Sequence, residues 1–287
     1  GSLGGRMKLA VASGKGGTGK TTVSVALALA AEEPVQLLDC DVEEPNAHLF
    51  VRPEWQPAEP VRAQVPELDE ERCTGCGECA AFCQFNAIAC VSGRAMIFEE
   101  LCHHCGGCAK VCPEGAMEDR ERTIGWGQQG RAGTRRFGQG RLDVGAPTAP
   151  PVVRAVKKNA AADRLVVIDC PPGAACPMVA AVTDADFVLL VTEPTPFGLH
   201  DLKAAVRVVE ELGRPFGVVV NRCDIGDGRV RDWCDEREIR ILAQIPEDRA
   251  VAEAIARGTP LIDAAPAWRG LFRDMPGMIR SMIGSAV

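Results

Sequence analysis

The stretch GKGGTGKTT, Gly14–Thr22, decides the fold. It follows a short apolar run, Leu9–Ala12, and precedes the apolar helical pattern VSVALALA. Between a strand and a helix, such glycines let backbone N–H groups approach phosphate oxygens, and the start of the helix adds a favourable dipole. The sequence therefore predicts a phosphate-binding loop. The residues expected to hold the nucleotide here are Gly14, Lys15, Gly16, Gly17, Thr18, Gly19, Lys20, Thr21 and Thr22.

Further short apolar runs, rich in β-branched residues, alternate with helical patterns along the chain. This alternation is typical of parallel strands buried on both faces. The other runs expected to be strands are Val35–Leu38, Leu165–Ile168, Phe187–Val191, Phe216–Val220 and Ile239–Ile245. The expected fold class is therefore α/β, a P-loop NTPase with a mostly parallel sheet flanked by helices. In such sheets ligands bind at the carboxyl ends of the strands.

Charged side chains at these strand ends fit a nucleotide with magnesium. Lys20 is expected to neutralise the β- and γ-phosphates, and the Thr21 hydroxyl to bind Mg²⁺. Asp39 and Asp41 follow the second run, on one side of the chain, and Asp169 ends the third at the position of a Walker B acid. Asp39 and Asp169 are thus predicted to help hold Mg²⁺, in preference to being caps or solvated loop charges.

Cysteine is concentrated in one segment: of fourteen in 287 residues, nine lie between Cys73 and Cys112. Eight of these form C-x2-C-x2-C-x3-C twice, offset by 29 residues, which resembles the bacterial two-cluster ferredoxins from about Glu67 to Asp119. In this pattern the fourth cysteine of each repeat reaches the other cluster. Two 4Fe–4S clusters are predicted, on Cys73, Cys76, Cys79 and Cys112, and on Cys102, Cys105, Cys108 and Cys83. Zinc, which needs two separated C-x2-C pairs, is the less favoured alternative.

The two cysteine repeats differ in detail. Pro113 follows Cys112, whereas Gln84 follows Cys83, so equal cluster potentials are not expected. His103 and His104 lie inside the second loop and are interpreted as solvent-facing rather than as groups that couple reduction to protonation.

More than a hundred residues separate the second and third predicted strands, too many for a simple connection. We expect the first part of the ATPase domain at 7–65, an inserted ferredoxin-like α+β domain at 66–119, and the rest of the ATPase domain at 120–287. The proline-studded stretch 53–66 is interpreted as a linker, and the Gly- and Arg-rich stretch 120–149 as a flexible connector in preference to a hairpin. GSLGGR, residues 1–6, is interpreted as an expression remnant before Met7.

Charge and hydropathy limit the possible partners. Glu67–Asp119 contains ten acidic and three basic residues, and Arg120–Arg141 contains six arginines with one acid, so the arginines are expected to meet an acidic partner or this acidic module. A pI near 5.3 argues against nucleic acid. No run reaches the about 18 to 20 apolar residues of a membrane span, and no signal segment follows Met7. A soluble cytoplasmic protein without stable membrane insertion is expected, and its amphipathic tail can equally pack in the core.

Together these motifs resemble the MinD/Mrp group of deviant Walker A ATPases, in the subgroup with an inserted two-cluster ferredoxin domain, over Met7–Val287. The resemblance implies a nucleotide-dependent homodimer in which Lys15 contacts the phosphates held by the opposite subunit. It also implies that Asp41 positions the attacking water and that Asp169 begins a second switch with Pro171, Pro172 and Gly173. Lys15, Lys20, Asp39 and Asp41 are thus the expected catalytic residues.

The base is expected to lie near Asn221 and Pro246, where this family binds adenine. The stretch NRCD, Asn221–Asp224, also resembles the guanine-reading N-K-x-D of GTPases, with Asp224 as the discriminating carboxylate. ATP is favoured over GTP because the KGGTGKT loop and the paired aspartates match the ATPases.

Six cysteines lie outside the two repeats: Cys40, Cys90, Cys170, Cys176, Cys223 and Cys234. Cys176 lies seven residues after Asp169, the offset of the cluster ligand in the related nitrogenase iron protein, and could hold metal together with its twin across a dimer. A buried, unreactive thiol is the preferred interpretation.

The expected function is ATP hydrolysis at a dimer interface, coupled to electron transfer through two 4Fe–4S clusters to an unidentified redox partner. The alternative is an ATP-dependent carrier or assembly factor that delivers a metal–sulfur cluster to an acceptor protein. A third possibility is a docking module whose ATP state selects its partner.

Overall fold

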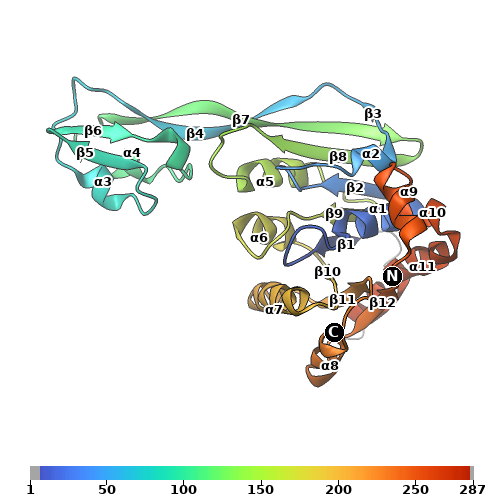
Figure 1. The fold of residues 1–287 in the computed structure, drawn as a ribbon. Coiled ribbons are helices and arrows are strands. Elements are labelled where there is room, and N and C mark those ends of the chain that lie inside the picture. The colour runs from blue at the N-terminus through green and yellow to red at the C-terminus, as the bar shows by residue number, and fades with distance from the viewer. Residues whose placement is uncertain (1–6, 285–287) are drawn as a thin grey trace. The chain divides into compact units, whose positions relative to one another are not determined.

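The computed structural model describes residues 7–284; residues 1–6, interpreted as an expression remnant, and the end of the C-terminal tail lie outside the described residues (Figure 1). The chain forms two compact units. The first reaches Ala58 and continues with Gly127–Arg141 and from Val153 onward. The second comprises Glu59–Trp126 and Leu142–Val152, so the expected inserted domain, 66–119, lies within it.

The first unit is built on a parallel sheet, with the strand order β12-β11-β10-β1-β9-β2-β8. Its strands are β1 (Met7–Ala12), β2 (Val35–Asp39), β8 (Arg135–Leu142), β9 (Leu165–Asp169), β10 (Phe187–Thr192), β11 (Phe216–Asn221) and β12 (Ile241–Ile245). All six strands predicted from apolar runs are confirmed. Because all of them are parallel, their carboxyl ends meet at one edge of the sheet.

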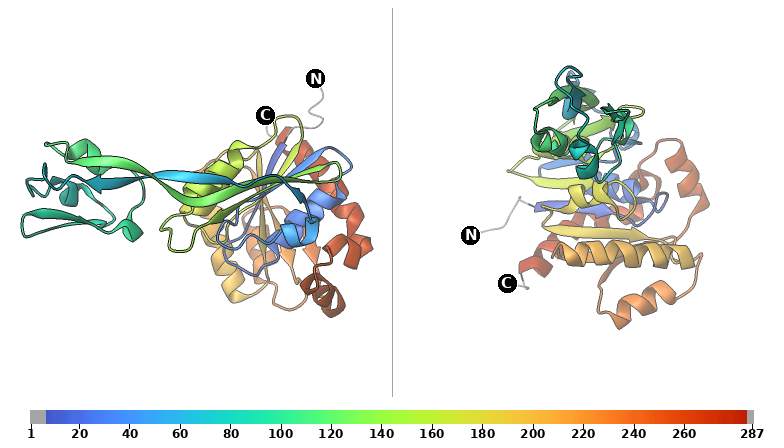
Figure 2. Two further views of the ribbon diagram at one scale, coloured as in Figure 1. Left: turned by 90° about the horizontal axis from the view of Figure 1, so that it is seen from above. Right: turned by 90° about the vertical axis from the view of Figure 1, so that its left-hand side faces the viewer.

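Helices cover both faces of this sheet (Figures 1 and 2). On one face α6 packs against β1 and α7 against β10, and on the other α1 packs against β1, β2 and β9. The helices of the chain outside the cysteine repeats are α1 (Lys20–Ala30), α2 (His48–Val51), α5 (Pro150–Lys158), α6 (Cys176–Val182), α7 (Pro196–Glu211), α8 (Arg229–Glu236), α9 (Arg249–Ala256), α10 (Leu261–Ala264) and α11 (Arg269–Gly284).

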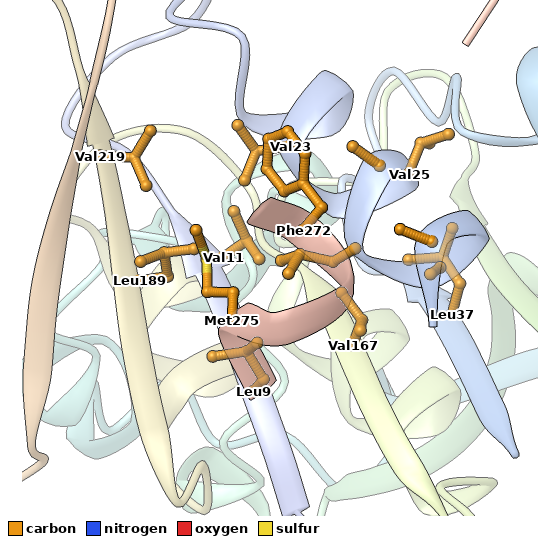
Figure 3. Packing of buried hydrophobic residues seen from close by; sticks show 14 of the residues in the cluster. Leu9, Val11, Val23, Val25, Leu37, Val167, Leu189, Val219, Phe272 and Met275 are labelled. Carbon is orange, nitrogen blue, oxygen red and sulfur yellow. The ribbon is translucent and has the colours of Figure 1, made fainter. Parts of the chain in front are cut away.

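The C-terminal helix α11 belongs to the core. Phe272 and Met275 are fully buried between β1 and α1, among Leu9, Val11 and Val23 (Figure 3). Its amphipathic pattern therefore reflects packing against α1. None of the helices in residues 7–284 is both long and apolar enough to cross a membrane.

The Gly- and Arg-rich stretch 120–149 is mostly strand, and its interpretation as a flexible connector is wrong. Met117–Ala132 form β7, and after a turn at Gly133 the chain returns as β8, which pairs with both β7 and β2. The glycines of this stretch allow neighbouring chain segments to approach closely. At Gly138, for example, a Cβ would lie 2.9 Å from Leu38 Cδ2. Stretch 53–66, interpreted as a linker, likewise contains β3 (Glu54–Trp55) and most of β4 (Glu59–Leu68).

The second unit has an α+β composition, drawn mainly in teal (Figure 1). Strand β4 pairs with β7, and β5 forms a separate antiparallel hairpin with β6. Its remaining elements are β5 (Ile88–Val91), β6 (Arg94–Ile97) and the short helices α3 (Glu78–Phe82) and α4 (Gly107–Val111), which contact each other. Two arginines of the basic stretch, Arg120 and Arg122, pair with Glu99 of this same unit.

The sequence repeat of the second unit is also a backbone repeat. Gly77 and Gly106, 29 residues apart, both have positive φ and precede α3 and α4. Gly75 and His104 form a second matching pair, with φ of 68° and 57°. Residues 29 positions apart therefore occupy equivalent places in the two halves.

Candidate functional site

The loop between β1 and α1 borders a cavity of about 720 Å³ at the carboxyl edge of the parallel sheet. Gly19 shows why glycine is needed: its φ is 90°, and a Cβ would lie 2.4 Å from Asn221 Nδ2. Among the expected nucleotide ligands, those that line the cavity are Gly16, Gly17, Gly19, Lys20, Thr21, Thr22, Asp41, Asn221 and Pro246. Gly14, Lys15 and Thr18 belong to the same loop but are not part of the lining.

Lys20 is the buried cation of this cavity. Its Nζ lies 2.8 Å from Asp169 Oδ1 and 3.4 Å from Asp41 Oδ2. Burial alone would lower the pKa of Lys20, but the charges of Asp169 and Asp41 outweigh burial and raise it. Lys20 therefore stays positively charged at the start of α1, where the helix dipole also favours an anion.

The two carboxylate oxygens of Asp169 have different surroundings. Its Oδ1 accepts from Lys20 and from the Ser24 hydroxyl at 3.0 Å, whereas the buried Oδ2 has no hydrogen-bond partner among the described residues. Such an atom suits a hydrated cation. Within residues 7–284 no three His, Cys, Asp or Glu side chains gather as ligands of one ion. Because Mg²⁺ retains waters and takes phosphate oxygens beside one or two protein ligands, Thr21 and Asp169 fit it.

Asp39 and Asp41 have different environments, although sequence reasoning treated them as a pair. Asp39 is fully buried; its Oδ1 accepts from the Asp41 N–H at 3.1 Å, and its Oδ2 from the N–H groups of Asn46 and Ala47 at 3.0 Å. Burial and the charge of Asp169 raise the pKa of Asp39 to about 7. Through these hydrogen bonds Asp39 holds the loop that follows β2, and Asp41 of this loop lines the cavity.

Lys15 is paired inside its own chain. Its Nζ lies 3.5 Å from Glu193 Oε2, and the other oxygen of Glu193 accepts from Arg222 Nη1 at 2.8 Å. Glu193 is buried, while Lys15 is about one-third exposed, at 33%. Sequence reasoning missed Glu193 and Arg222. Each directly follows a strand, Glu193 after β10 and Arg222 after β11, and lies two residues beyond the last residue of the predicted run; this position was the available signal.

Apolar side chains also contribute to the lining of this cavity. Leu49 and Phe50 of α2 and Val251 and Ile255 of α9 line it together with Pro246. These helix residues were also missed, because nothing in their spacing marks them as ligand contacts.

Asn221 and Asp224 serve the loops around this cavity. Asn221 Nδ2 donates to the Thr18 carbonyl at 2.9 Å and so ties β11 to the phosphate loop. Asp224 Oδ1 accepts from the Glu247 N–H at 2.7 Å, and Asp224 is not among the residues that line the cavity. The carboxylate that the guanine alternative requires is therefore used to connect two loops.

The eight repeated cysteines surround two small cavities of the second unit. The first is lined by Cys73, Cys76, Cys79 and Cys112, and the second by Cys83, Cys102, Cys105 and Cys108. This grouping exchanges the fourth cysteine of each repeat, as the spacing predicts. A fifth cysteine, Cys90, also lines the first cavity.

Backbone amides point at equivalent sulfurs in the two halves. The Ala116 N–H donates to Cys112 Sγ and the Ala87 N–H to Cys83 Sγ, both at 3.3 Å. For Cys112 the slight effect of burial is outweighed by amides from four following residues, which lower the pKa of the thiol. Such donors stabilise a thiolate, the form in which cysteine binds metal.

Three further side chains can be compared with their expected environments. His103 is exposed but stacks on Phe85, with ring centroids 3.8 Å apart. His104 is half-buried, with Nδ1 3.2 Å from the Gln64 carbonyl, so the solvent-facing interpretation is wrong for His104. Cys176 is exposed, and its interpretation as a buried thiol is wrong as well.

Fold, phosphate loop and strand-end acids together define a P-loop nucleotide-binding protein. Residues 9–261 match the family model described as the CobQ/CobB/MinD/ParA nucleotide binding domain, so the chain belongs to that family.

Relatives and solved structures agree with this assignment. The chain is 32% identical over 263 residues to an uncharacterised protein of Methanocaldococcus jannaschii, covering 90% of this chain and 91% of that protein. It is 25% identical over 264 residues to an uncharacterised ATP-binding protein of the same organism, covering 90% and 81%. A shorter match, 28% over 116 residues, joins it to the iron-sulfur cluster carrier protein of Aquifex aeolicus, covering 35% and 32%. The Pyrococcus furiosus cell division ATPase MinD has the same fold, with TM-score 0.55, 21% identity and coverage of 95% and 99%.

Proposed function

We propose that this protein hydrolyses ATP as a nucleotide-dependent homodimer and uses the resulting switch to control electron transfer through two 4Fe–4S clusters. The observation that carries the proposal is the grouping of eight cysteines around two cavities, four to each, in a chain that also has a complete P-loop site. ATP, Mg²⁺ and two 4Fe–4S clusters are the cofactors it requires.

At the phosphate site each charged residue has a distinct task. Lys20 binds the β- and γ-phosphates of its own nucleotide, and Thr21 and Asp169 hold Mg²⁺. Asp41 lines the cavity and positions the attacking water, while Asp39 holds the loop that carries Asp41. Lys15 supplies a cation to the nucleotide of the second subunit, so hydrolysis depends on association, like an arginine finger supplied in trans.

In the second unit the cysteines act as the ligands of the clusters, which supply one-electron redox chemistry when bound. Each cavity is lined by the four cysteines that one 4Fe–4S cluster would take as ligands. The amides directed at Cys83 and Cys112 stabilise negative charge on those sulfurs. The cysteines lie in an acidic segment, in which Arg120 pairs with Glu67 and Glu99. The net negative charge of this segment favours a protein partner over nucleic acid.

A second candidate function is an ATP-dependent carrier of iron–sulfur clusters. The partial similarity to the Aquifex carrier protein favours it, as does the exposure of Cys76 and Cys105, one cysteine in each cavity. A carrier releases its cluster to an apo-acceptor in a nucleotide-dependent way, whereas a redox switch retains both clusters through turnover.

The deciding experiment is an EPR-monitored redox titration of anaerobically purified protein with and without ATP and Mg²⁺. The redox proposal expects both clusters to remain bound and at least one potential to shift on addition of nucleotide. Loss of cluster to an apo-ferredoxin in the presence of ATP would favour the carrier instead. Identical spectra and potentials in both states, with no transfer, would overturn the coupling altogether.

A further inference from the structure

The first cysteine cavity contains one thiol more than a cluster needs. Cys90, on β5, lines it together with Cys73, Cys76, Cys79 and Cys112. Its Sγ donates to the Gly75 carbonyl at 3.3 Å, and Gly75 immediately precedes Cys76. Both Cys76 and Cys90 are exposed, whereas Cys79 is buried. Cys90 is therefore beside the most accessible expected ligand of this cavity.

Tight packing fixes this neighbourhood. A Cβ at Gly75 would lie 2.0 Å from the Gly93 carbonyl oxygen, so the turn between β5 and β6 lies directly against the loop that carries Cys73 and Cys76. Gly75 also has a φ of 68°, which glycine adopts without strain. The hairpin thus holds Cys90 against this loop through backbone contact.

The second half of the same unit lacks this arrangement. The internal offset of 29 residues places Asp119 where the first half has Cys90. Asp119 Oδ2 lies 3.3 Å from the position of a Cβ on Gly106, within the loop that carries Cys105 and Cys108. The lining of the second cavity contains four cysteines, Cys83, Cys102, Cys105 and Cys108. The molecule therefore provides its own comparison, a thiol in one half and a carboxylate in the other.

We propose that Cys90 is a reserve ligand of the first 4Fe–4S cluster, able to take the place of Cys76. This inference rests on the proposed function, because it requires the clusters. In the exchange the bond from Cys76 Sγ to iron breaks and the released thiolate takes up a proton. The Cys90 thiol gives up its proton as its own bond to iron forms. One proton is gained and one lost, and no electron is transferred.

The test compares alanine variants at equivalent positions, purified anaerobically, by iron and acid-labile sulfide per chain and by EPR after reduction with dithionite. Wild type should hold about eight iron atoms. Cys76→Ala should keep nearly all of them, with a changed EPR line shape, because Cys90 replaces the lost ligand. Cys105→Ala, at the matching place in the second half, should lose about half of the iron. Cys76→Ala/Cys90→Ala should lose about half as well, and Cys90→Ala alone should keep the wild-type amount.

A gain-of-function variant tests the same inference by restoring iron instead of removing it. Asp119→Cys in the Cys105→Ala background should restore iron to the second cavity, since it supplies the same reserve thiol there. Equal iron loss in Cys76→Ala and Cys105→Ala, or equal iron in Cys76→Ala with and without Cys90, would overturn the inference. A wild-type protein without clusters would instead overturn the proposed function, so the two failures are distinguishable.

Discussion

Glu193 is shared by two cations, Lys15 and Arg222, and this sharing bears on how Lys15 works. The Lys15 pair has a separation of 3.5 Å and is partly exposed, and ion pairs of this kind contribute at most about 1 kcal/mol to stability. Glu193 keeps a partner in Arg222 if Lys15 leaves. The proposed movement of Lys15 to a phosphate outside its own chain would therefore cost little.

Lys15→Ala tests this role. ATP turnover should fall by about a thousandfold, the size of effect seen for a cation supplied in trans, because the phosphates lose that cation. Nucleotide affinity of the single chain should stay within about twofold of wild type, since Lys15 is not part of the cavity lining. Steady-state kinetics and equilibrium binding of a fluorescent ATP analogue measure the two quantities. Lys20→Ala is the matched control and should lose affinity itself; loss of affinity in both variants would contradict the trans role.

Asp39 predicts a pH dependence of stability. Its pKa is raised to about 7 in the folded protein, above its ordinary value of 3.8, by burial and by the charge of Asp169. Between these two values the folded state binds a proton that the unfolded state does not. This contribution to the free energy of unfolding is complete below pH 4 and is lost as pH rises toward 7, by up to about 1.4 kcal/mol per pH unit.

The measurement is thermal unfolding of nucleotide-free protein between pH 5 and 8. Wild type should lose stability over this range relative to Asp39→Asn, which cannot titrate. Parallel pH profiles for the two proteins would show that Asp39 does not hold this proton.

At the scale of elements, the end of β11 decides between two interpretations of NRCD. Asn221→Ala should weaken ATP binding about tenfold, because a partly buried hydrogen bond to the phosphate loop is lost. Asp224→Asn should leave the preference for ATP over GTP unchanged, since Asp224 bonds to the Glu247 N–H instead of lining the cavity. Competition binding with both nucleotides measures this, and a loss of GTP discrimination in Asp224→Asn would restore the guanine-type interpretation.

Some strands could be predicted from sequence patterns and others could not. The six parallel strands were predictable because each is a mostly apolar run, and all but the edge strand β12 are largely buried. Strands β7 and β8 were not, because their glycines serve close contacts such as that of Gly138 with Leu38, which only the pairing with β2 creates. Within the site, Lys20 and Asp169 follow from motif and strand end. Phe50 and Ile255 enter through tertiary packing, for which the sequence has no local pattern.

For the whole molecule, the division into two compact units predicts the effect of removing iron. The small core of the second unit contains Cys79 and Cys108 beside Ile88, Ala95 and Met117, so its packing depends on cysteines that are expected to bind metal. Treatment with oxidant and chelator should make the second unit sensitive to protease. ATP affinity of the first unit should stay within about twofold. Cleavage sites identified by mass spectrometry, together with ATP titration, test this; loss of ATP affinity would show that the units do not fold independently.

Asp119 and Cys90 occupy equivalent positions in the two halves of the second unit but differ in charge, whereas Glu114 also lines the first cavity. A carboxylate near Cys108 opposes the arrival of an electron, whereas the corresponding thiol carries no charge when protonated. Asp119→Asn should raise one of the two midpoint potentials, that of the cluster expected in the second cavity, and leave the other nearly unchanged, as resolved by EPR titration; a shift of both by the same amount would contradict this.

A difference in midpoint potential between the two proposed clusters would give electron transfer through the small unit a single direction. An electron held at the Cys90 end would lie next to the most exposed expected ligand of the first cavity, Cys76. A donor and an acceptor could then use opposite ends of a relay that runs in one direction.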